Sequence, residues 1–314
     1  MKAVRFHEYG DPDVLRYEDV DDPIPGAGQV RVRVAATTFN GVDGNIRAGF
    51  MQGPMPLTLP HVPGLDVAGT VDALGAGVEG VSVGDEVIGF LPFVVDGASA
   101  EFVLAPAEAL TAAPASIPLA DAAALPLVGL TAWQALFEHA ELKAAQRILI
   151  NGASGAVGGY ATQLAKAGGA HVIATASGPS TERVRAAGAD EVVDHTAGDV
   201  AAALTEPVDV LLNLAPLTPE QFGALAGRVR DGGVVVNTTV WMPAPADEAR
   251  GMRGIDLYVR SDAAQLAELV ARVDRGELSV DVAERVPLAE LASVHARAAA
   301  GGISGKVVVL VETD

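Results

Sequence analysis

The chain has 314 residues, and 40 acidic against 21 basic side chains give it a formal net charge of −19 at pH 7. Nucleic acids and anionic membranes bind basic surfaces, so this charge argues against both as partners. No cysteine is present, which excludes disulfides, thiol nucleophiles and thiolate metal ligands. Half of the residues are hydrophobic, and no stretch has the length and apolar character of a membrane span or a signal peptide. We therefore expect a folded cytoplasmic protein.

Short β segments interrupted by glycine and proline make up the chain to about residue 121. Residues 30–36 alternate valine with arginine, residues 66–72 follow Pro63-Gly64, and residues 101–104 follow a glycine. Brief strands separated by frequent turns are typical of a barrel-like all-β unit. We predict such a unit at the start of the chain.

From residue 121 onward, alanine-rich helical patterns alternate with short apolar runs. The apolar runs cover residues 147–151, 171–176, 191–193, 208–212 and 233–237. Strands that alternate with helices predict βαβ units, and therefore a parallel sheet with helices on both faces. This part of the chain is predicted to have the α/β fold class.

The remainder of the chain resembles neither half. We expect a strand at residues 256–259, a helix at about 262–275, a second helix after Pro287 and a closing strand at 306–311. Because its pattern matches neither half, we predict that this tail returns to the first domain. Residues 242–248 have the composition of a surface loop.

Residues 147–158, RILINGASGAVG, combine a strand, a glycine turn and a helix start in that order. Gly152 and Gly155 would let the backbone approach a pyrophosphate, and Gly158 would let the helix pack on the strand. Glycines also open strand-to-helix turns that bind nothing. A second strand about 20 residues downstream favours dinucleotide binding here. The predicted phosphate cradle consists of Gly152, Ala153, Ser154, Gly155, Ala156, Val157 and Gly158.

The end of the second strand bears on which dinucleotide is bound. An NAD site has an acidic residue at this point, whereas this strand ends Ala174-Thr175-Ala176-Ser177 and the next carboxylate is Glu182. Ser177, Ser180 and Thr181, with Arg183 or Arg185 for charge, would suit a 2′-phosphate. The sequence therefore favours NADP, although both arginines would also fit the solvated face of a helix.

Segments along the whole chain resemble the zinc-independent quinone oxidoreductases of the medium-chain dehydrogenase/reductase superfamily, the ζ-crystallin-like group. The matching segments are residues 1–15, 39–43 with 46–47, 63–69, 83–87, 97–102, 129–134, 147–158, 186–194 and 305–307. Their common order along the chain makes the resemblance more specific than any single segment.

The resemblance implies a GroES-like β-barrel domain plus a Rossmann domain with a doubly wound parallel sheet. The first would comprise residues 1–121 completed by 256–314, the second residues 122–255, and the active-site cleft would lie at their junction. It also implies NADPH as cofactor and a homodimer formed through the edge of the Rossmann sheet.

The resemblance also implies that no metal is bound. In the zinc-dependent relatives a cysteine and a histidine hold the ion, and here Asn40 and Leu65 stand at those positions. A leucine cannot bind zinc, and the six histidines show no paired ligand spacing. Without a Lewis acid, a quinone or an α,β-unsaturated carbonyl is the expected acceptor, because conjugation spreads the incoming charge.

Two side chains are expected to act on the acceptor or beside it. The Asn40 amide is our candidate donor to the acceptor carbonyl, and Asp43 is expected to anchor its loop or the nicotinamide ribose. By the resemblance, Thr131 would reach the nicotinamide from a helix start, although it would also serve as a plain helix N-cap. The cofactor would further contact Asn213 and Asn237.

Two positions depart from the pattern of the relatives. Many of them carry a tyrosine where this chain has Asn45, and the usual lysine for the 2′-phosphate is missing from residues 178–181. The expected substrate pocket comprises Phe39, Asn45, Phe50, Leu65, Phe93 and Trp241, each of which would also suit plain core packing.

The leading hypothesis is an NADPH-dependent, zinc-independent reductase of quinones or α,β-unsaturated carbonyls. One alternative keeps the cofactor and changes the acceptor to an enoyl thioester or polyketide intermediate, for which a basic entrance would be expected. The other alternative is a non-catalytic NADPH-binding sensor. Its support is that Asn45 replaces the tyrosine that many relatives carry.

Overall fold

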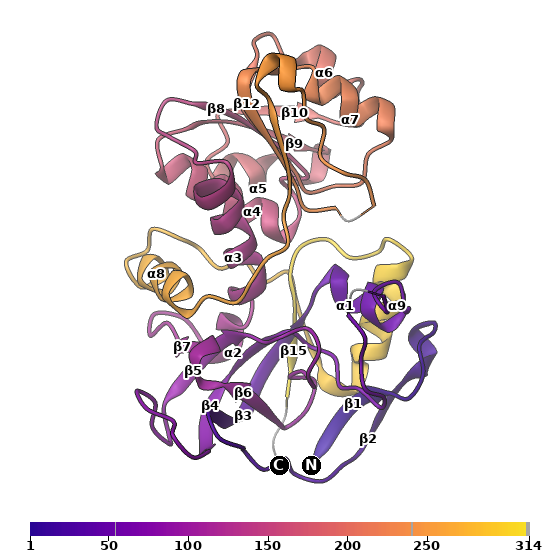
Figure 1. Cartoon of the computed structure of the whole chain (residues 1–314), viewed down its shortest axis with the longest axis vertical. Coiled ribbons are helices and arrows are strands. Elements are labelled where there is room, and N and C mark those ends of the chain that lie inside the picture. The colour runs from indigo at the N-terminus through magenta and orange to yellow at the C-terminus, as the bar shows by residue number, and fades with distance from the viewer. Residues whose placement is uncertain (54, 240, 312–314) are drawn as a thin grey trace. The chain divides into compact units, whose positions relative to one another are not determined.

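The structure is a computed structural model that describes residues 1–53, 55–239 and 241–311. The chain forms two compact units: unit 1 contains Met1–Leu127 and Ser261–Asp314, and unit 2 contains Val128–Arg260 (Figure 1). These boundaries lie a few residues beyond the expected ones at 121 and 256. Among the described residues, no helix has the length and apolar character to cross a membrane.

Unit 1 is built on a sheet in the order β14-β15-β3-β4-β5-β7, to which β6 adds by pairing with β3. Its pairs are antiparallel except β14 with β15. The strands are β3 (Gln29–Phe39), β4 (Asp66–Leu74), β5 (Glu86–Phe90), β6 (Phe102–Pro106), β7 (Leu110–Ala112), β14 (Glu284–Pro287) and β15 (Val307–Leu310). A separate antiparallel pair consists of β1 (Lys2–Phe6) and β2 (Leu15–Asp19).

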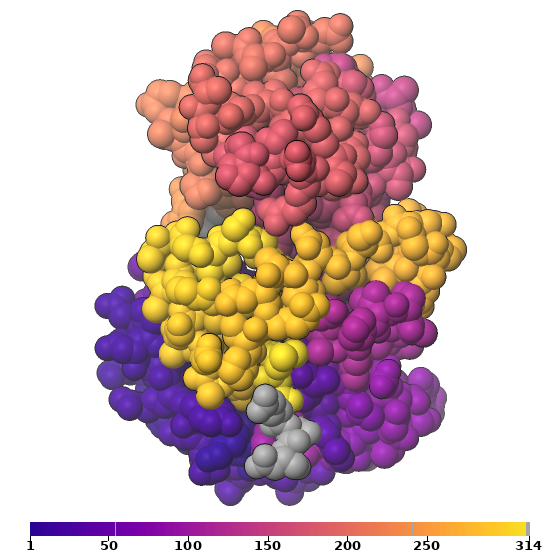
Figure 2. Space-filling view, turned by 180° about the vertical axis from the view of Figure 1, so that it is seen from behind, coloured from indigo at the N-terminus to yellow at the C-terminus, as the bar shows by residue number. Residues whose placement is uncertain are grey.

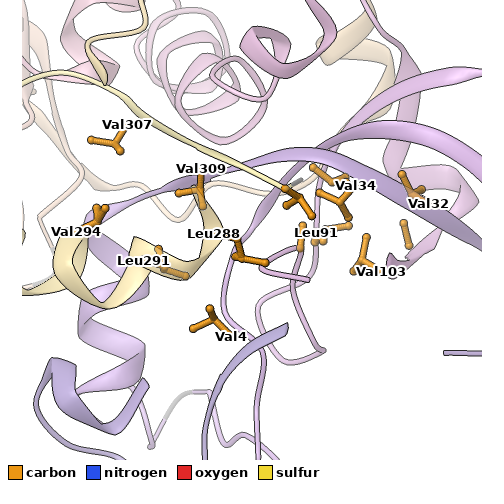
Figure 3. Close-up of a cluster of buried hydrophobic side chains, with 14 of the residues drawn as sticks. Val4, Val32, Val34, Leu91, Val103, Leu288, Leu291, Val294, Val307 and Val309 are labelled. Atoms are coloured by element: carbon orange, nitrogen blue, oxygen red, sulfur yellow. The ribbon is translucent and has the colours of Figure 1, made fainter. Parts of the chain in front are cut away.

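The core of unit 1 joins residues from both ends of the chain. Val30, Val32 and Val34 alternate along β3 with polar residues and are buried, as the sequence pattern predicts. They belong to the same cluster as Val4 of β1 and Val309 of β15 (Figure 3). Strand β3 is longer than predicted because β4, β6 and β15 all pair with it.

The two longest helices of unit 1, α8 and α9, come from the C-terminal segment, and α9 lies against η1 and α1 of the N-terminal part (Figure 2). Asp262 caps α8 by accepting a hydrogen bond from the Gln265 N–H. The helical elements are η1 (Pro12–Val14), α1 (Gly41–Arg47), η2 (Ala107–Ala109), α2 (Leu119–Ala122), α8 (Ala263–Asp274), η6 (Leu288–Glu290) and α9 (Leu291–Ala299).

Unit 2 is built on a parallel sheet of six strands in the order β10-β9-β8-β11-β12-β13. The order reverses between β8 and β11, so the carboxyl ends of these strands flank the switch point of a doubly wound fold. The strands are β8 (Arg147–Asn151), β9 (His171–Ala176), β10 (Glu191–Asp194), β11 (Val208–Asn213), β12 (Val229–Asn237) and β13 (Arg253–Asp256).

Both faces of the sheet are covered. Leu149, Leu211 and Val235 pack into the cluster that contains Phe222 of α7, while the alternate residues of the same strands are buried as well. The helical elements are α3 (Pro126–Trp133), whose first two residues belong to unit 1, the π-helical η3 (Gln134–His139), α4 (Ala156–Ala167), η4 (Gly178–Ser180), α5 (Thr181–Ala186), α6 (Val200–Ala203), α7 (Pro219–Ala226) and η5 (Glu248–Arg250).

The strand expected at residues 256–259 lies earlier, as β13 at Arg253–Asp256. Pairing with β12 decides its position, because Arg253 to Asp256 align with Val234 to Asn237. The chain leaves the sheet after Leu257, whose N–H donates to the Asn237 carbonyl. A local sequence pattern does not contain this register.

Candidate active site

The glycine turn lies between β8 and α4. Gly152 has a φ of +88°, a backbone conformation that favours glycine. A Cβ added to Gly158 would lie 2.5 Å from the Ala153 Cα, whereas one added to Gly155 would meet nothing closer than 3.4 Å. Gly158 therefore lets the helix approach the strand, and Gly155 leaves open space beside the turn.

The first turn of α4 offers backbone donors to this space. Gly155 is the N-cap residue and has no side chain to accept their hydrogen bonds, and the first N–H groups of a helix have no partner within it. The helix dipole adds partial positive charge at the same end. The turn thus has the room and the donors that a pyrophosphate requires.

The segment after β9 reaches back to the glycine turn. The Ser180 hydroxyl accepts from the Ser177 N–H at 3.2 Å and donates to the Ser177 carbonyl at 3.0 Å. The Arg183 guanidinium donates to the Ser154 carbonyl at 2.7 Å. The structure therefore brings Arg183 to the turn, whereas Arg185 lies exposed on the same helix.

Three asparagines end three neighbouring strands and align with one another. Asn213 of β11 is in register with Asn151 of β8 and Asn237 of β12. The Asn151 Nδ2 donates to the Asn213 Oδ1 at 2.8 Å, and the Asn213 Nδ2 donates to the Asn237 Oδ1 at 2.9 Å. We call this buried series the asparagine ladder.

Backbone and side-chain groups form hydrogen bonds with both ends of the ladder. The Gly152 N–H donates to the Thr175 hydroxyl at 2.9 Å, and that hydroxyl donates to the Asn151 Oδ1 at 3.1 Å. At the other end, the Asn237 Nδ2 donates to the Thr239 and Met242 carbonyls, both at 2.8 Å, and to the Asp256 carboxylate at 3.0 Å.

A pocket of about 240 Å³ lies beside the last rung of the ladder. Trp241 and Tyr258 contribute two largely exposed aromatic rings to it. The pocket is lined by Asn237, Thr238, Thr239, Trp241, Met242, Pro243, Asp256, Leu257 and Tyr258. It therefore combines aromatic surfaces with polar groups, as binding sites for planar ligands do.

In unit 1, Asn40 belongs to a buried polar network around Asp66. The Asn40 Nδ2 donates to the Asp66 carboxylate at 2.9 Å, and the Lys306 Nζ donates to the Asn40 Oδ1 at 2.5 Å and to Asp66 at 3.1 Å. Thr38 also donates to Asp66. Both polar atoms of the Asn40 amide are thus engaged, and the Asn40 Nδ2 also donates to the Thr38 hydroxyl at 3.4 Å.

Asp43 lies beside this network and lines a small pocket of about 10 Å³, the space of one water molecule. Burial raises the pKa of Asp43 to about 7, although backbone hydrogen bonds from Asn40 and Gly64 favour the carboxylate. Leu65 and Phe93, both expected in the substrate pocket, line the same space, as does His61. Burial lowers the pKa of His61, against the opposite effect of Asp96 at 3.5 Å.

Other expected pocket residues lie elsewhere. The Phe39 ring packs edge-on against His295 with 4.8 Å between centroids. Phe50 is 66% exposed, and Asn45 is half-buried outside the residues that line the Asp43 pocket. Thr131 is not at a helix start, because Pro126 opens α3 five residues earlier. It is a buried residue inside that helix.

Several site residues were missed from the sequence. Asp66 and Lys306 occur in the segments that carry the resemblance, but nothing local indicates that they pair across 240 residues. Asn151 and Thr175 had a usable signal, since polar residues at the carboxyl ends of parallel strands lie at one edge of the sheet. Two of the apolar runs end on asparagine and a third is followed by one.

A parallel sheet in this order with a glycine turn at its switch point defines a dinucleotide-binding fold. A model of the alcohol dehydrogenase GroES-like domain matches residues 26–115, and one of zinc-binding dehydrogenases matches residues 187–309. The chloroplast envelope quinone oxidoreductase homolog of Arabidopsis thaliana is 32% identical over 98% of this chain and 98% of its own length.

Two solved structures extend the comparison. The quinone oxidoreductase from Coxiella burnetii is 28% identical, with a TM-score of 0.91 over 99% of each chain. The CurK enoyl reductase is 25% identical, with a TM-score of 0.87 over 99% of each chain. The chain belongs to the medium-chain dehydrogenase/reductase superfamily, among the homologues of quinone oxidoreductases, and is an oxidoreductase.

The residues of this chain do not fit the zinc that one matching family model is named for. Leu65 offers no ligand atom, the Asn40 amide is engaged, and Asp66 is paired with Lys306. Within residues 1–53, 55–239 and 241–311, no three His, Asp or Glu side chains lie together as a metal site.

Proposed function

We propose that this protein transfers a hydride from NADPH to a quinone or an α,β-unsaturated carbonyl. The glycine turn carries the proposal, because open space at Gly155 lies beside the first N–H groups of α4, which have no partner within the helix. Members of this superfamily bind a nicotinamide dinucleotide, which supplies the hydride. Residues 152–158 would hold its pyrophosphate through backbone amides.

The preference for NADPH is supported by the segment that follows β9. No carboxylate ends this strand, so nothing there would repel a 2′-phosphate or bind a free ribose hydroxyl in its place. Ser177, Ser180 and Arg183 would surround the phosphate, and the bond from Arg183 to Ser154 keeps that charge beside the turn.

For the acceptor, we propose that Asn40 donates a hydrogen bond to the carbonyl that receives negative charge. Lys306 fixes the orientation of the Asn40 amide by donating to its oxygen. Asp43 would hold the Asn40 backbone, since its carboxylate accepts the Asn40 N–H at 2.8 Å. A conjugated acceptor suits such a site because hydrogen-bond donors suffice to stabilise its delocalised charge.

The first alternative, an enoyl-thioester or polyketide-tailoring reductase, has the likeness to the CurK enoyl reductase in its favour. A thioester acceptor that outcompetes quinones would favour it. The second alternative, a non-catalytic sensor, would bind NADPH without consuming it. A homodimer and a cytoplasmic location stay predictions.

A spectrophotometric acceptor screen tests the proposal. We expect the purified protein to oxidise NADPH in the presence of a simple quinone, and Asn40→Ala to lower turnover by about tenfold while NADPH still binds. Thr38→Val, which removes another donor to Asp66, is the control for damage to the buried network. If wild-type protein binds neither dinucleotide, as judged by its melting temperature, the proposed function is wrong.

Ser177→Asp is expected to weaken NADPH binding by about tenfold and to leave NADH binding nearly unchanged, because a carboxylate repels the 2′-phosphate. Arg183→Ala should act in the same direction but by less, since an exposed charge is screened. Arg185→Ala, on the same helix, is the matched control. Equal losses for NADPH and NADH would show that the 2′-phosphate does not lie at this strand end.

A further inference from the structure

The hydrogen bonds of the asparagine ladder have a fixed direction. The Gly152 N–H can only donate, so the Thr175 hydroxyl accepts it and gives its own proton to the Asn151 Oδ1. At the other end, the Thr239 and Met242 carbonyls can only accept, so Asn237 must turn its Nδ2 toward them. The Asn237 Oδ1 therefore faces Asn213 and accepts from its Nδ2.

Asn213 has to act as acceptor and donor at the same time. It accepts from Asn151 on one side and donates to Asn237 on the other, and its side chain is 1% exposed. An aspartate at this position would lack the donor when ionised, and a leucine would lack both groups. Leaving such buried partners unsatisfied is unfavourable.

Asn237 in turn holds the wall of the 240 Å³ pocket. Its Nδ2 binds the carbonyls of Thr239 and Met242 on either side of Trp241, while its Oδ1 accepts from the Thr239 N–H and hydroxyl. One amide thus binds both Thr239 and Met242, which line the pocket. The Asn213 Nδ2 adds a further hydrogen bond to the same Oδ1, at 2.9 Å.

We propose that Asn213 is a positioning residue, which acts through Asn237 to hold Thr239, Trp241 and Met242 in the form that orients the ring end of the bound dinucleotide. Asn213 and Asn237 were expected to contact the cofactor, whereas here Asn213 acts without touching it. The inference rests on the proposed function, since it requires a dinucleotide held at the glycine turn. Loss of the rung should therefore impair turnover more than binding.

Asn213→Asp tests this with a side chain whose donor can be switched on and off. Once protonated, the new carboxyl can donate to the Asn237 Oδ1, and once ionised it cannot. Burial and the nearby Asp256 carboxylate, which accepts from Asn237, both favour the protonated form at low pH. The defect should therefore be rescued at low pH, while Asn213→Leu should remain defective at every pH.

The first readout needs no cofactor. The chain has two tryptophans, so a Trp133→Phe background reports Trp241 alone. For Asn213→Asp we expect acrylamide quenching of Trp241 to match the parent at about pH 5.5 and to be about twofold stronger at about pH 8.5. Quenching equal to the parent at both pH values, with a lower melting temperature, would overturn the proposal.

Gln134→Glu is the matched control. Gln134 is also buried in unit 2 and exchanges hydrogen bonds with the Arg260 backbone, at 3.0 and 3.1 Å. The substitution creates the same conflict between a carboxylate and a carbonyl, away from the ladder. We expect a lower melting temperature with Trp241 quenching unchanged, and a parallel change in quenching would mean that the effect is not specific to the ladder.

The second readout uses NADPH and a quinone. At about pH 8.5, Asn213→Asp should lower kcat by about tenfold and change the Kd for NADPH by less than about threefold, because the pyrophosphate still binds at the turn. At about pH 5.5 the variant should approach wild type. An equal loss in kcat and affinity would contradict a positioning role. If wild-type protein does not bind NADPH, the proposed function itself fails, whatever Trp241 shows.

Discussion

Gly158→Ala is expected to abolish dinucleotide binding and to lower the melting temperature, whereas Gly159→Ala should do neither. An added Cβ at Gly158 would lie 2.5 Å from both the Gly152 carbonyl oxygen and the Ala153 Cα. Both are backbone atoms of the turn itself, so relief of the clash must distort the cradle. Overpacking of this kind costs about 1–3 kcal/mol of unfolding free energy.

The variants Gly155→Ala and Gly159→Ala separate an effect on cofactor binding from an effect on folding. At Gly155 the nearest atom to a new Cβ is 3.4 Å away, so Gly155→Ala should fold normally, yet its methyl group would occupy the space offered to the pyrophosphate. We expect NADPH affinity to fall by about tenfold or more. Gly159, where nothing lies within 4 Å, should gain about 0.5–1 kcal/mol as alanine in a helix.

Calorimetry with and without NADPH measures all three variants. A Gly155→Ala protein that binds NADPH as tightly as wild type would show that the phosphates do not approach this turn. A Gly158→Ala protein with wild-type stability would contradict the close packing of α4 on β8.

The second large effect is a pH dependence of stability that two buried groups of unit 1 contribute with opposite signs. Burial next to Arg47 lowers the pKa of His295 to about 3, and neither ring nitrogen has a hydrogen-bond partner among the described residues. The unfolded chain therefore binds a proton that the folded chain does not, between about pH 3 and 6.5. His295 therefore contributes a free energy of unfolding that increases as pH rises.

Asp43 acts in the opposite direction. Burial raises its pKa to about 7, with Asp66 also raising it, against Lys306 and the backbone groups of Asn40 and Gly64. The folded chain thus binds a proton that the unfolded chain has lost, between about pH 4 and 7. Asp43 therefore contributes a free energy of unfolding that decreases as pH rises. The contributions of Asp43 and His295 offset each other over most of that range.

Substituting each group singly should show its contribution to the pH dependence of stability. Relative to wild type, the unfolding free energy of Asp43→Asn should rise with pH by up to about 1.4 kcal/mol per unit between about pH 4 and 7. That of His295→Leu should fall by a similar amount per unit between about pH 3 and 6.5. Thermal unfolding in a series of buffers measures both. Parallel pH profiles for either variant and wild type would show that the group titrates normally.

The double variant is the control, since it removes both terms and should follow the wild-type profile. The exposed ion pairs, such as Lys2 with Asp19, are present in all four proteins, and their pH dependence therefore cancels in these differences. A double variant that follows either single variant would mean that the two groups do not titrate independently.

The sequence by itself predicts a structural feature when all the residues that cause the feature lie in one stretch of the chain. The glycine turn is such a case, because the positive φ at Gly152 and the close approach at Gly158 both arise within residues 147–158. The alternation along β3 likewise predicts which side chains are buried. The succession of strands and helices from residue 147 onward predicts the parallel sheet for the same reason.

Only the tertiary structure determines which side chains come into contact when they lie far apart in the sequence. Lys306 pairs with Asp66, Arg183 reaches Ser154, and Asn151, Asn213 and Asn237 align because three strands adopt one register. Thr131 lies inside a helix because Pro126 begins it earlier than the motif suggested. These features depend on register and on the packing of segments far apart in sequence, and no local pattern of residues encodes either one.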